Sequence, residues 1–388
     1  MGYFVPHESL ENLKAYKYQS DDRSIVSYYL LKPFWRKFSK IFPLWMAPNV
    51  VTLSGFCFII INVITTLYYD PTLTEESPRW TYFSYALGIF LYQTFDACDG
   101  MHARRTGQSG PLGELFDHCI DSLNTTLSLF PFCSATGIGY SYLFIFSQFA
   151  VLCNFYLSTW EEYHTHMLFL SEFSGPVEGI LLICSTFILA GIFGPQVVWH
   201  TELASFTLGK YTFKFETLDL MIGFSALGLL FNIISARRNV LQYYEKEDGD
   251  DCNEKQWKAM TGLAPFFIYY ATVFLAILIE PKFMSFPFIV SIGLTMAFVV
   301  GRIIIAHLTK QKFPVDNPPM AIPFFQIIFH SIATSFLGYD NEAVVTALVW
   351  LGFGLSVGIH LMFVNDIIYD FTAYLDIYAL SIKHPKVA

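Results

Sequence analysis

The sequence predicts an all-α polytopic membrane protein, with about ten transmembrane helices after an N-terminal interfacial amphipathic helix. Of the 388 residues, 54% are hydrophobic and 14% are charged, and the mean hydropathy is +0.45. Soluble domains carry about 25% charged residues, so this balance favours lipid as the solvent. Apolar stretches close to the roughly 20 residues that cross a bilayer recur from Pro48 nearly to the end. The 40 Phe and 23 Tyr residues fit a membrane protein with aromatic belts.

The N-terminal segment, residues 1–47, is mixed and is predicted to lie in the cytosol. Between Tyr28 and Phe42, aromatic and apolar residues alternate with lysines. Such a pattern is typical of an amphipathic helix that lies on a membrane surface. A solvated helix that only precedes the first span would show the same pattern, and both interpretations stay open.

The predicted membrane domain covers residues 48–365, and residues 366–388 form a predicted cytosolic C-terminal tail. The expected spans lie near residues 49–69, 80–100, 112–134, 139–159, 176–195, 217–236, 262–280, 284–306, 320–338 and 343–365. With this count, eleven lysines and arginines fall in the loops on one side and four on the other. Because positive loops stay in the cytosol, both termini are predicted to be cytosolic.

The net charge argues against a nucleic-acid-binding protein, and the cysteines suggest no special site. A net charge of −9 provides no basic surface for nucleic acid. The seven cysteines form no CxxC pairs and most lie in apolar runs, so they are expected to be small core residues.

The motif that carries chemistry is an acidic hairpin, predicted over residues 80–134. Asp96 and Asp99 end the second span, three residues apart. Glu114, Asp117, His118 and Asp121 begin the third span, at offsets that place them on one stripe of a helix. The glycine-rich loop between the spans is short, so the two helices should be antiparallel neighbours whose acidic edges converge.

Four clustered carboxylates in a membrane need cations. An Asp at mid-span costs about 2.5 to 3.5 kcal/mol on insertion scales, and neighbouring carboxylates repel one another. Oxygen ligands suit hard cations such as Mg²⁺ or Mn²⁺, and a pair of ions can hold both the attacking and the leaving oxygen of an in-line displacement. A helix cap or an Arg pair could explain a lone Asp, but not four on two facing helix ends.

The spacing of this hairpin resembles the signature of the CDP-alcohol phosphotransferase family. The pattern Asp-x2-Asp-Gly-x2-Ala-Arg-x8-Gly-x3-Asp-x3-Asp is matched at every position, by Asp96, Asp99, Gly100, Ala103, Arg104, Gly113, Asp117 and Asp121. Nearly the whole chain is similar to the fungal choline and ethanolamine branch, in segments such as PRWTYFSYALG, FYLSTWEEYHTH, SEFSGPVEGI and YLDIYALSIKHPK. The stretch FDACDGMHARRTGQ and the tail favour the choline enzymes of that branch.

The resemblance implies transfer of phosphocholine from CDP-choline to the free hydroxyl of diacylglycerol, giving phosphatidylcholine and CMP. Ethanolamine specificity, or dual specificity, is the alternative within the family. The resemblance also implies two divalent ions, an endoplasmic reticulum or Golgi membrane and a homodimer. The implied metal ligands are Asp96, Asp99, Asp117 and Asp121, and the implied nucleotide site is lined by Gly100, Ala103, Arg104 and Gly113. A Pro-Asn element before the first span, here Pro48 and Asn49, should approach the cytidine or the pyrophosphate.

Two residues are candidates for the proton acceptor. Asp121 is one, but a carboxylate beside divalent cations has a depressed pKa. His118 has an ordinary pKa near 6.5 and lies on the same stripe, which favours it as the base. Glu114, one turn earlier, is expected to hydrogen-bond the imidazole and set its tautomer, although it could contact the substrate instead.

A second polar run, Trp160 to His166, could hold a quaternary ammonium by cation–π contact, or could belong to an interfacial belt. The main rival from another class is a cation-coupled membrane transporter, and a cation sensor is a weaker third. Transporters usually show matching broken helices in two repeats, and the second half of the sequence has no matching acidic cluster.

Overall fold

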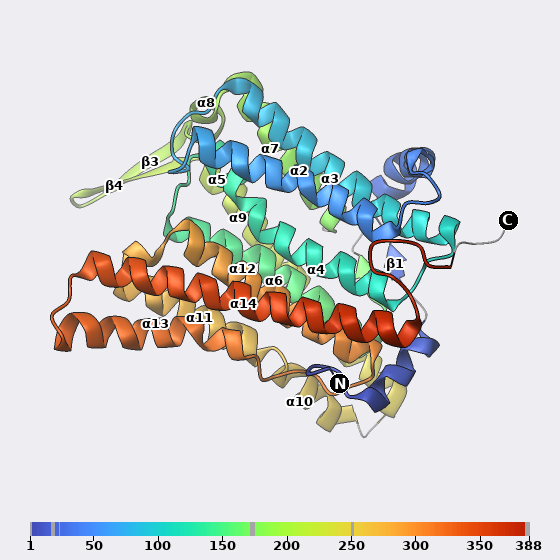
Figure 1. The fold of residues 1–388 in the computed structure, drawn as a ribbon. Helices are drawn as coiled ribbons and strands as arrows, with labels where there is room; N and C mark the ends of the chain where they lie inside the picture. The colour runs from blue at the N-terminus through green and yellow to red at the C-terminus, as the bar shows by residue number, and fades with distance from the viewer. Residues whose placement is uncertain (1, 17–19, 23, 171–174, 250–251, 385–388) are drawn as a thin grey trace.

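The computed structural model describes residues 2–16, 20–22, 24–170, 175–249 and 252–384, and most of these residues are helical (Figure 1). The α-helices are α1 (Lys32–Phe38), α2 (Pro48–Tyr69), α3 (Arg79–Thr106), α4 (Pro111–Leu127), α5 (Leu129–Thr136), α6 (Tyr142–Thr165), α7 (Pro176–Phe193), α8 (Pro195–Trp199), α9 (Thr217–Asp248), α10 (Cys252–Thr261), α11 (Ala264–Ile279), α12 (Phe286–Leu308), α13 (Ile322–Ser331) and α14 (Asn341–Leu375). The shorter helical turns are η1 (His7–Ala15), η2 (Ser27–Leu31), η3 (Ser39–Ile41), η5 (Pro281–Phe283), η6 (Pro318–Ala321) and η7 (Ile332–Phe336).

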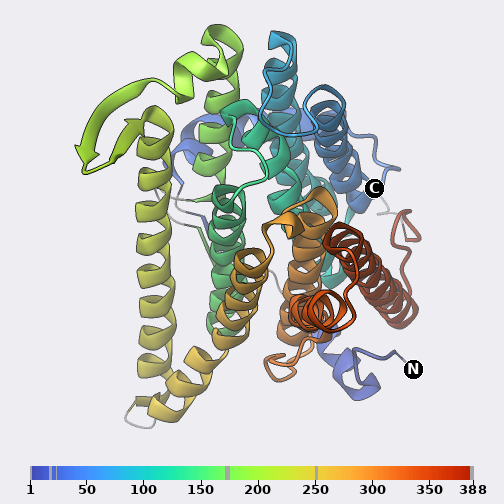
Figure 2. The same cartoon turned by 90° about the vertical axis from the view of Figure 1, so that its left-hand side faces the viewer.

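Two small two-stranded sheets accompany the helices. Strands β1 (Ser20–Asp22) and β2 (Leu168–Leu170) pair in parallel, with Ser20 opposite Leu168. Strands β3 (Glu202–Leu208) and β4 (Tyr211–Glu216) form an antiparallel hairpin that projects from the helices at one end of the molecule (Figures 1 and 2).

The prediction of a polytopic all-α membrane protein is confirmed. Seven helical stretches among the described residues are long and apolar enough to cross a membrane: α2, α6, α9, α10 with α11, α12, the stretch from η6 to η7, and α14. The shorter apolar helix α7 and the more polar α3 and α4–α5 cover the remaining predicted spans. Each of the ten expected spans therefore overlaps a helix or a pair of helices.

Two helix boundaries differ from the expectation. The third span is broken into α4 and α5 at Ser128, because Pro131 has no N–H and its ring clashes with the carbonyl four residues earlier. The last helix, α14, continues to Leu375, ten residues beyond the expected end of the membrane domain at residue 365.

The N-terminal segment contains the expected helix, as the continuous turns η2, α1 and η3. Tyr28, Tyr29 and Leu30 are exposed, whereas Trp35 on the other face is buried against the helical body. A row of exposed apolar side chains beside lysines suits a membrane surface. Placement at that surface stays a prediction.

The helices form two groups with a shared centre (Figure 1). Helices α2, α3 and α7 pack together on one side, and α11, α13 and α14 lie on the other. Helix α12, the most buried of the long apolar helices, packs against α4, α6 and α14. The acidic helix α4 thus lies between the two groups.

Two glycines let neighbouring helices approach one another closely. A Cβ on Gly55 of α2 would lie 2.8 Å from Cβ of Phe95 on α3. A Cβ on Gly293 of α12 would lie 2.7 Å from Oγ1 of Thr126 on α4. Real Cβ atoms do not come this close, so glycine at these positions fixes α3 against α2 and α4 against α12.

Candidate active site

The loop between α3 and α4 is built by glycine and proline. Gly107 ends α3 in the left-handed conformation, with φ of 70°, and the N–H of Gln108 donates to the carbonyl of Ala103 at 2.8 Å. This is the hydrogen bond of a Schellman cap, which favours glycine. Pro111 then occupies the first turn of α4, where its missing N–H costs nothing. The chain therefore reverses within a few residues, and α3 and α4 present their acidic edges to one cavity.

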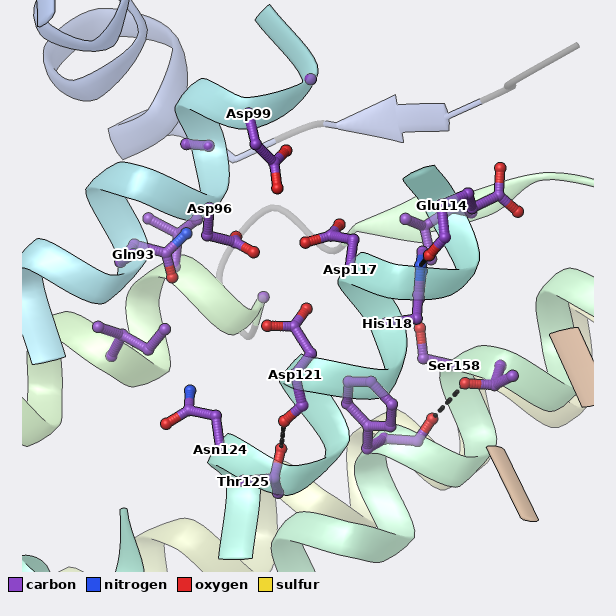
Figure 3. Close-up of a pocket in the computed structure, with 18 of the residues that line it drawn as sticks. Gln93, Asp96, Asp99, Glu114, Asp117, His118, Asp121, Asn124, Thr125 and Ser158 are labelled. Atoms are coloured by element: carbon purple, nitrogen blue, oxygen red, sulfur yellow. Dashed lines mark hydrogen bonds between the residues drawn. The ribbon is translucent and has the colours of Figure 1, made fainter. Parts of the chain in front are cut away.

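The four signature carboxylates (Asp96, Asp99, Asp117 and Asp121) point toward one another from α3 and α4 (Figure 3). Single carboxylate oxygens of Asp96, Asp99 and Asp117 all lie within 4.8 Å of one another. Asp121 lies one turn further along α4 and lines the same cavity. The predicted convergence of the two acidic helix ends is thus present.

Neighbouring hydroxyls orient two of these carboxylates. Thr52 of α2 donates a hydrogen bond to Asp99, and the phenol of Tyr92, one turn before Asp96 on α3, donates to Asp121. Hydrogen bonds to metal-binding carboxylates fix the direction of their lone pairs. Thr52 and Tyr92 therefore hold Asp99 and Asp121 facing the cavity.

The remaining oxygens fit a bound cation. Oδ1 of Asp96 and Oδ1 of Asp117 are buried and have no hydrogen-bond partner among the described residues. Among the described residues, no Lys or Arg forms an ion pair with a signature carboxylate. Buried charges are normally paired or coordinate metals, so this oxygen-rich set suits hard divalent cations.

All of the residues predicted to contact substrate line one cavity of about 1260 Å³. Its polar end is lined by Pro48, Asn49, Gly100, Ala103, Arg104 and Gly113. The cavity then passes the signature carboxylates and reaches α6, α7 and α9, where Asn154, Ile180, Ile183 and Asn232 line it. It thus joins a polar end, where Arg104 lies, to a wall built from helices of the membrane domain.

The C-terminal segment contacts two residues that line the cavity. The side-chain amide of Asn49 donates to the carbonyl of Ala379 at 2.9 Å, and the amide of Gln108 donates to the carbonyl of His384 at 2.9 Å. These contacts hold residues 379–384 against the start of α2 and against the loop after α3. The sequence assigned no contact to this segment, because short polar tails carry no periodic pattern.

His118 is buried and lines the cavity beside Asp117 (Figure 3). Its Nδ1 lies 2.9 Å from the backbone carbonyl of Glu114, so Nδ1 carries a proton and Nε2 has the free lone pair. Nε2 lies 3.9 Å from a carboxylate oxygen of Glu162 on α6.

The expected hydrogen bond between the Glu114 side chain and His118 is therefore corrected. The contact comes from the Glu114 backbone, since the carbonyl four residues earlier lies directly beside a helical side chain. The Glu114 carboxylate instead accepts a hydrogen bond from the hydroxyl of Tyr16.

The run from Trp160 to His166 serves mainly to pack the helices. Trp160 is fully buried, and its indole N–H donates to the carbonyl of Ala259 at 2.9 Å. Tyr163 donates to the carbonyl of Gln311, and His164 pairs with the hydroxyl of Tyr244. Within this run Glu161 lines the cavity, where it accepts a hydrogen bond from Asn239 of α9.

Sequence reasoning missed Thr52, Tyr92 and Tyr16 as partners of the acidic residues. For two of them, the spacing in the sequence pointed to the site. Thr52 lies three residues after Asn49 and so shares its helix face, and Tyr92 lies four residues before Asp96. Tyr16 comes from a distant segment, and nothing in its local pattern points to Glu114.

Comparisons with known proteins agree with this geometry. A family model described as CDP-alcohol phosphatidyltransferase matches residues 45–201, which include every predicted metal and substrate residue. The chain is 62% identical to cholinephosphotransferase 1 and 60% identical to choline/ethanolaminephosphotransferase 1, both of Saccharomyces cerevisiae, over 100% of each chain. It is 33% identical to choline/ethanolaminephosphotransferase 1 of Arabidopsis thaliana, again over 100% of both chains.

The fold and the site define a membrane-embedded transferase with an acidic centre that suits divalent cations. The chain belongs to the CDP-alcohol phosphatidyltransferase class-I family.

Proposed function

We propose that this enzyme transfers phosphocholine from CDP-choline to the free hydroxyl of diacylglycerol, giving phosphatidylcholine and CMP. The observation that carries the proposal is the meeting of Asp96, Asp99 and Asp117 in a cavity that also exposes Arg104. The 62% identity to a protein named cholinephosphotransferase supports choline as the head group. The 60% identity to a choline/ethanolaminephosphotransferase makes dual specificity the second candidate.

The signature carboxylates would hold two divalent cations, with Mg²⁺ or Mn²⁺ as the candidates. Such ions neutralise a bound pyrophosphate and stabilise the charge on the attacking and leaving oxygens. The buried, unpartnered oxygens of Asp96 and Asp117 support this assignment. Arg104 at the polar end supplies a further positive charge for the nucleotide phosphates.

The reaction is a single displacement at the β-phosphorus of CDP-choline. The diacylglycerol hydroxyl oxygen forms the new bond to phosphorus, and the bond from phosphorus to the bridging oxygen breaks. CMP leaves with the electron pair of that bond. The hydroxyl proton must pass to an acceptor within the cavity.

His118 is the proposed proton acceptor. Its Nδ1 is engaged by the Glu114 carbonyl, which leaves Nε2 as the basic atom. Asp121 is the alternative, but it already accepts a hydrogen bond from Tyr92 and belongs to the proposed metal ligands. The geometry therefore favours His118, with the Glu114 backbone as the positioning group.

Diacylglycerol is proposed to enter from the bilayer between α7 and α9. Both helices line the cavity, through Ile180 and Ile183 of α7 and Asn232 of α9. Helix α9 packs against α6 and α10, whereas α7 packs against α3 and α5. An acceptor with long acyl chains could then reach the carboxylates without leaving the membrane.

We place the enzyme in the endoplasmic reticulum or Golgi membrane, with both termini and the polar end of the cavity facing the cytosol. A homodimer is also proposed. Exposed apolar side chains on the later helices, including Phe324, Phe325 and Trp350, offer a surface that a second copy or lipid would cover. Cross-linking in native membranes would detect the dimer.

Release of CMP by the purified protein tests the function. The assay combines diacylglycerol and Mg²⁺ with either CDP-choline or CDP-ethanolamine. A much higher rate with CDP-choline supports the proposal, and equal rates would assign dual specificity. CMP release must stop when the lipid acceptor or the metal is withheld. Folded protein that makes no CMP from either donor would refute the proposal, and cation-driven transport in liposomes would support the transporter instead.

A further inference from the structure

A second group of ligating side chains lies beside the proposed active site. Glu114 of α4, Glu162 of α6 and His307 of α12 each offer one ligand atom, and the three atoms lie within 4.8 Å of one another. We call these residues the carboxylate–histidine cluster. Glu162 and His307 do not line the cavity that contains the signature carboxylates. The cluster shares no residue with Asp96, Asp99 and Asp117, which form the other such group.

The two carboxylates of this cluster are buried, and no Lys or Arg in the described part of the chain compensates their charge. Glu162 is 4% exposed and Glu114 is 9% exposed. Within the described residues, neither carboxylate forms an ion pair with Lys or Arg, and the Glu162 carboxylate accepts no hydrogen bond. The nearest basic atom to Glu162 is Nε2 of His118 at 3.9 Å, beyond hydrogen-bond distance. Leaving a carboxylate buried without a partner is costly, so a positive charge is expected here.

His307 provides an independent observation. Its Nδ1 is buried and has no hydrogen-bond partner among the described residues. Buried polar atoms in proteins nearly always have a partner, and a nitrogen that lacks a hydrogen bond can be satisfied by a bound ion. One imidazole nitrogen of His307 and the two carboxylates thus lie around the same small space. The hydroxyl of Tyr16 donates to the Glu114 carboxylate, but no hydrogen-bond donor among the described residues reaches the Glu162 carboxylate.

We propose that Glu114, Glu162 and His307 bind a divalent transition-metal ion such as Zn²⁺, separate from the ions of the signature carboxylates. Imidazole with carboxylate is a ligand set for such metals, whereas Mg²⁺ favours oxygen alone. Zinc bonds to these groups measure about 2.0 to 2.2 Å. Ligand atoms around one zinc ion therefore lie closer together than these three do, and they would need to approach one another by about 1 Å when the ion binds. Two carboxylates, one neutral imidazole and a dication sum to zero charge, which suits a buried site.

The ion would join three helices next to the catalytic groups. Glu114 lies one helical turn before His118 on α4, and Glu162 and His307 anchor it to α6 and α12. Tyr16, which donates to the Glu114 carboxylate, would orient this ligand from outside. The proposed role is to position α4.

Cobalt spectroscopy distinguishes this site from the signature site. Co²⁺ held by six oxygens absorbs weakly in the visible range, whereas four-coordinate Co²⁺ with an imidazole ligand absorbs strongly. The full-length protein would be stripped with chelator, saturated with Mg²⁺ to fill the oxygen site and titrated with Co²⁺. We expect an intense visible band that saturates at one ion per chain, and its loss in His307→Ala and Glu162→Gln.

The matched control is His360→Ala on α14. His360 is buried, and like His307 it has an unpartnered Nδ1 among the described residues. It does not belong to the cluster, so this variant should keep the band. Should the loss variants misfold, His307→Cys provides a positive signal, because direct ligation adds a thiolate-to-cobalt charge-transfer band in the near ultraviolet. No intense band in the wild type, or an unchanged band in a folded His307→Ala, overturns the proposal. Protons would then neutralise the two carboxylates.

Discussion

Thr52 of α2 donates a hydrogen bond to Asp99 of α3, and so ties the first long helix to the acidic cluster. The contact depends on the close approach of α2 to α3 at Gly55. It means that the direction of one signature carboxylate is set by a residue outside the signature.

Removing this hydroxyl should weaken metal binding more than it weakens folding. For Thr52→Val we expect the Mg²⁺ concentration for half-maximal CMP release to rise about 10-fold, because partners behind metal ligands are typically worth 10- to 100-fold. Thr52→Ser keeps the hydroxyl and should restore the wild-type value. An unchanged Mg²⁺ dependence in Thr52→Val would show that Asp99 needs no such partner.

Replacement of the proposed base should lower turnover sharply. General base catalysis contributes about 10²- to 10⁴-fold, so His118→Ala should lose at least that lower factor in kcat. The measurement is CMP release at saturating CDP-choline, diacylglycerol and Mg²⁺, with His360→Ala as a control for the loss of a buried histidine. More than a tenth of wild-type turnover in His118→Ala would shift the assignment to Asp121.

The contact of α12 with α4 should tolerate no side chain at Gly293. An added methyl group would meet Oγ1 of Thr126 at 2.7 Å, and overpacking of this kind costs about 1 to 3 kcal/mol. Gly293→Ala should therefore lower the free energy of unfolding by that amount in detergent. Gly228→Ala on α9, where an added Cβ meets nothing within 4 Å, is the matched control. Equal stability of the two variants would mean that α12 can move away from α4 without cost.

The C-terminal segment should be held in a pH-dependent manner. Asp376 accepts hydrogen bonds from Lys383 and His384, and these donors lower the pKa of the Asp376 carboxyl. The unfolded value is about 3.9. The folded pKa is the lower of the two. The stabilisation from these hydrogen bonds is therefore fully present above the unfolded pKa and is lost as the pH falls through the folded pKa.

A spin label at position 381, in a background without the exposed Cys57 thiol, would report this attachment. The label should be restrained from neutral pH down to about pH 4 and become mobile as the pH falls further, through the lowered pKa of Asp376. In Asp376→Asn the label should be mobile throughout, because the charged acceptor is gone. Identical spectra for the two proteins at neutral pH would show that the contacts of Asn49 and Gln108 suffice.

The sequence predicted the fold class, the helix positions and the convergence of the signature residues, because hydropathy and helical spacing are local properties. Ser128 and Pro131 show the limit of that reasoning, since a continuous apolar run concealed the break between α4 and α5. Asp96, Asp99 and Asp117 could be placed together because a short loop constrains two helices to be neighbours. Tyr16, Glu162 and His307 could not, because their meeting depends on how distant segments pack around α4.

The hydrogen bond from Asn49 to Ala379 has a consequence for biosynthesis. Its two residues lie 330 positions apart, so Asn49 enters the membrane long before its partner has been translated. The polar end of the cavity therefore gains this contact only after α14 has been inserted and residue 379 has left the ribosome. A nascent chain can hold all of its signature carboxylates and still lack this contact at Asn49. Termination between residues 376 and 379 would leave every helix in place and remove the Ala379 carbonyl that Asn49 contacts.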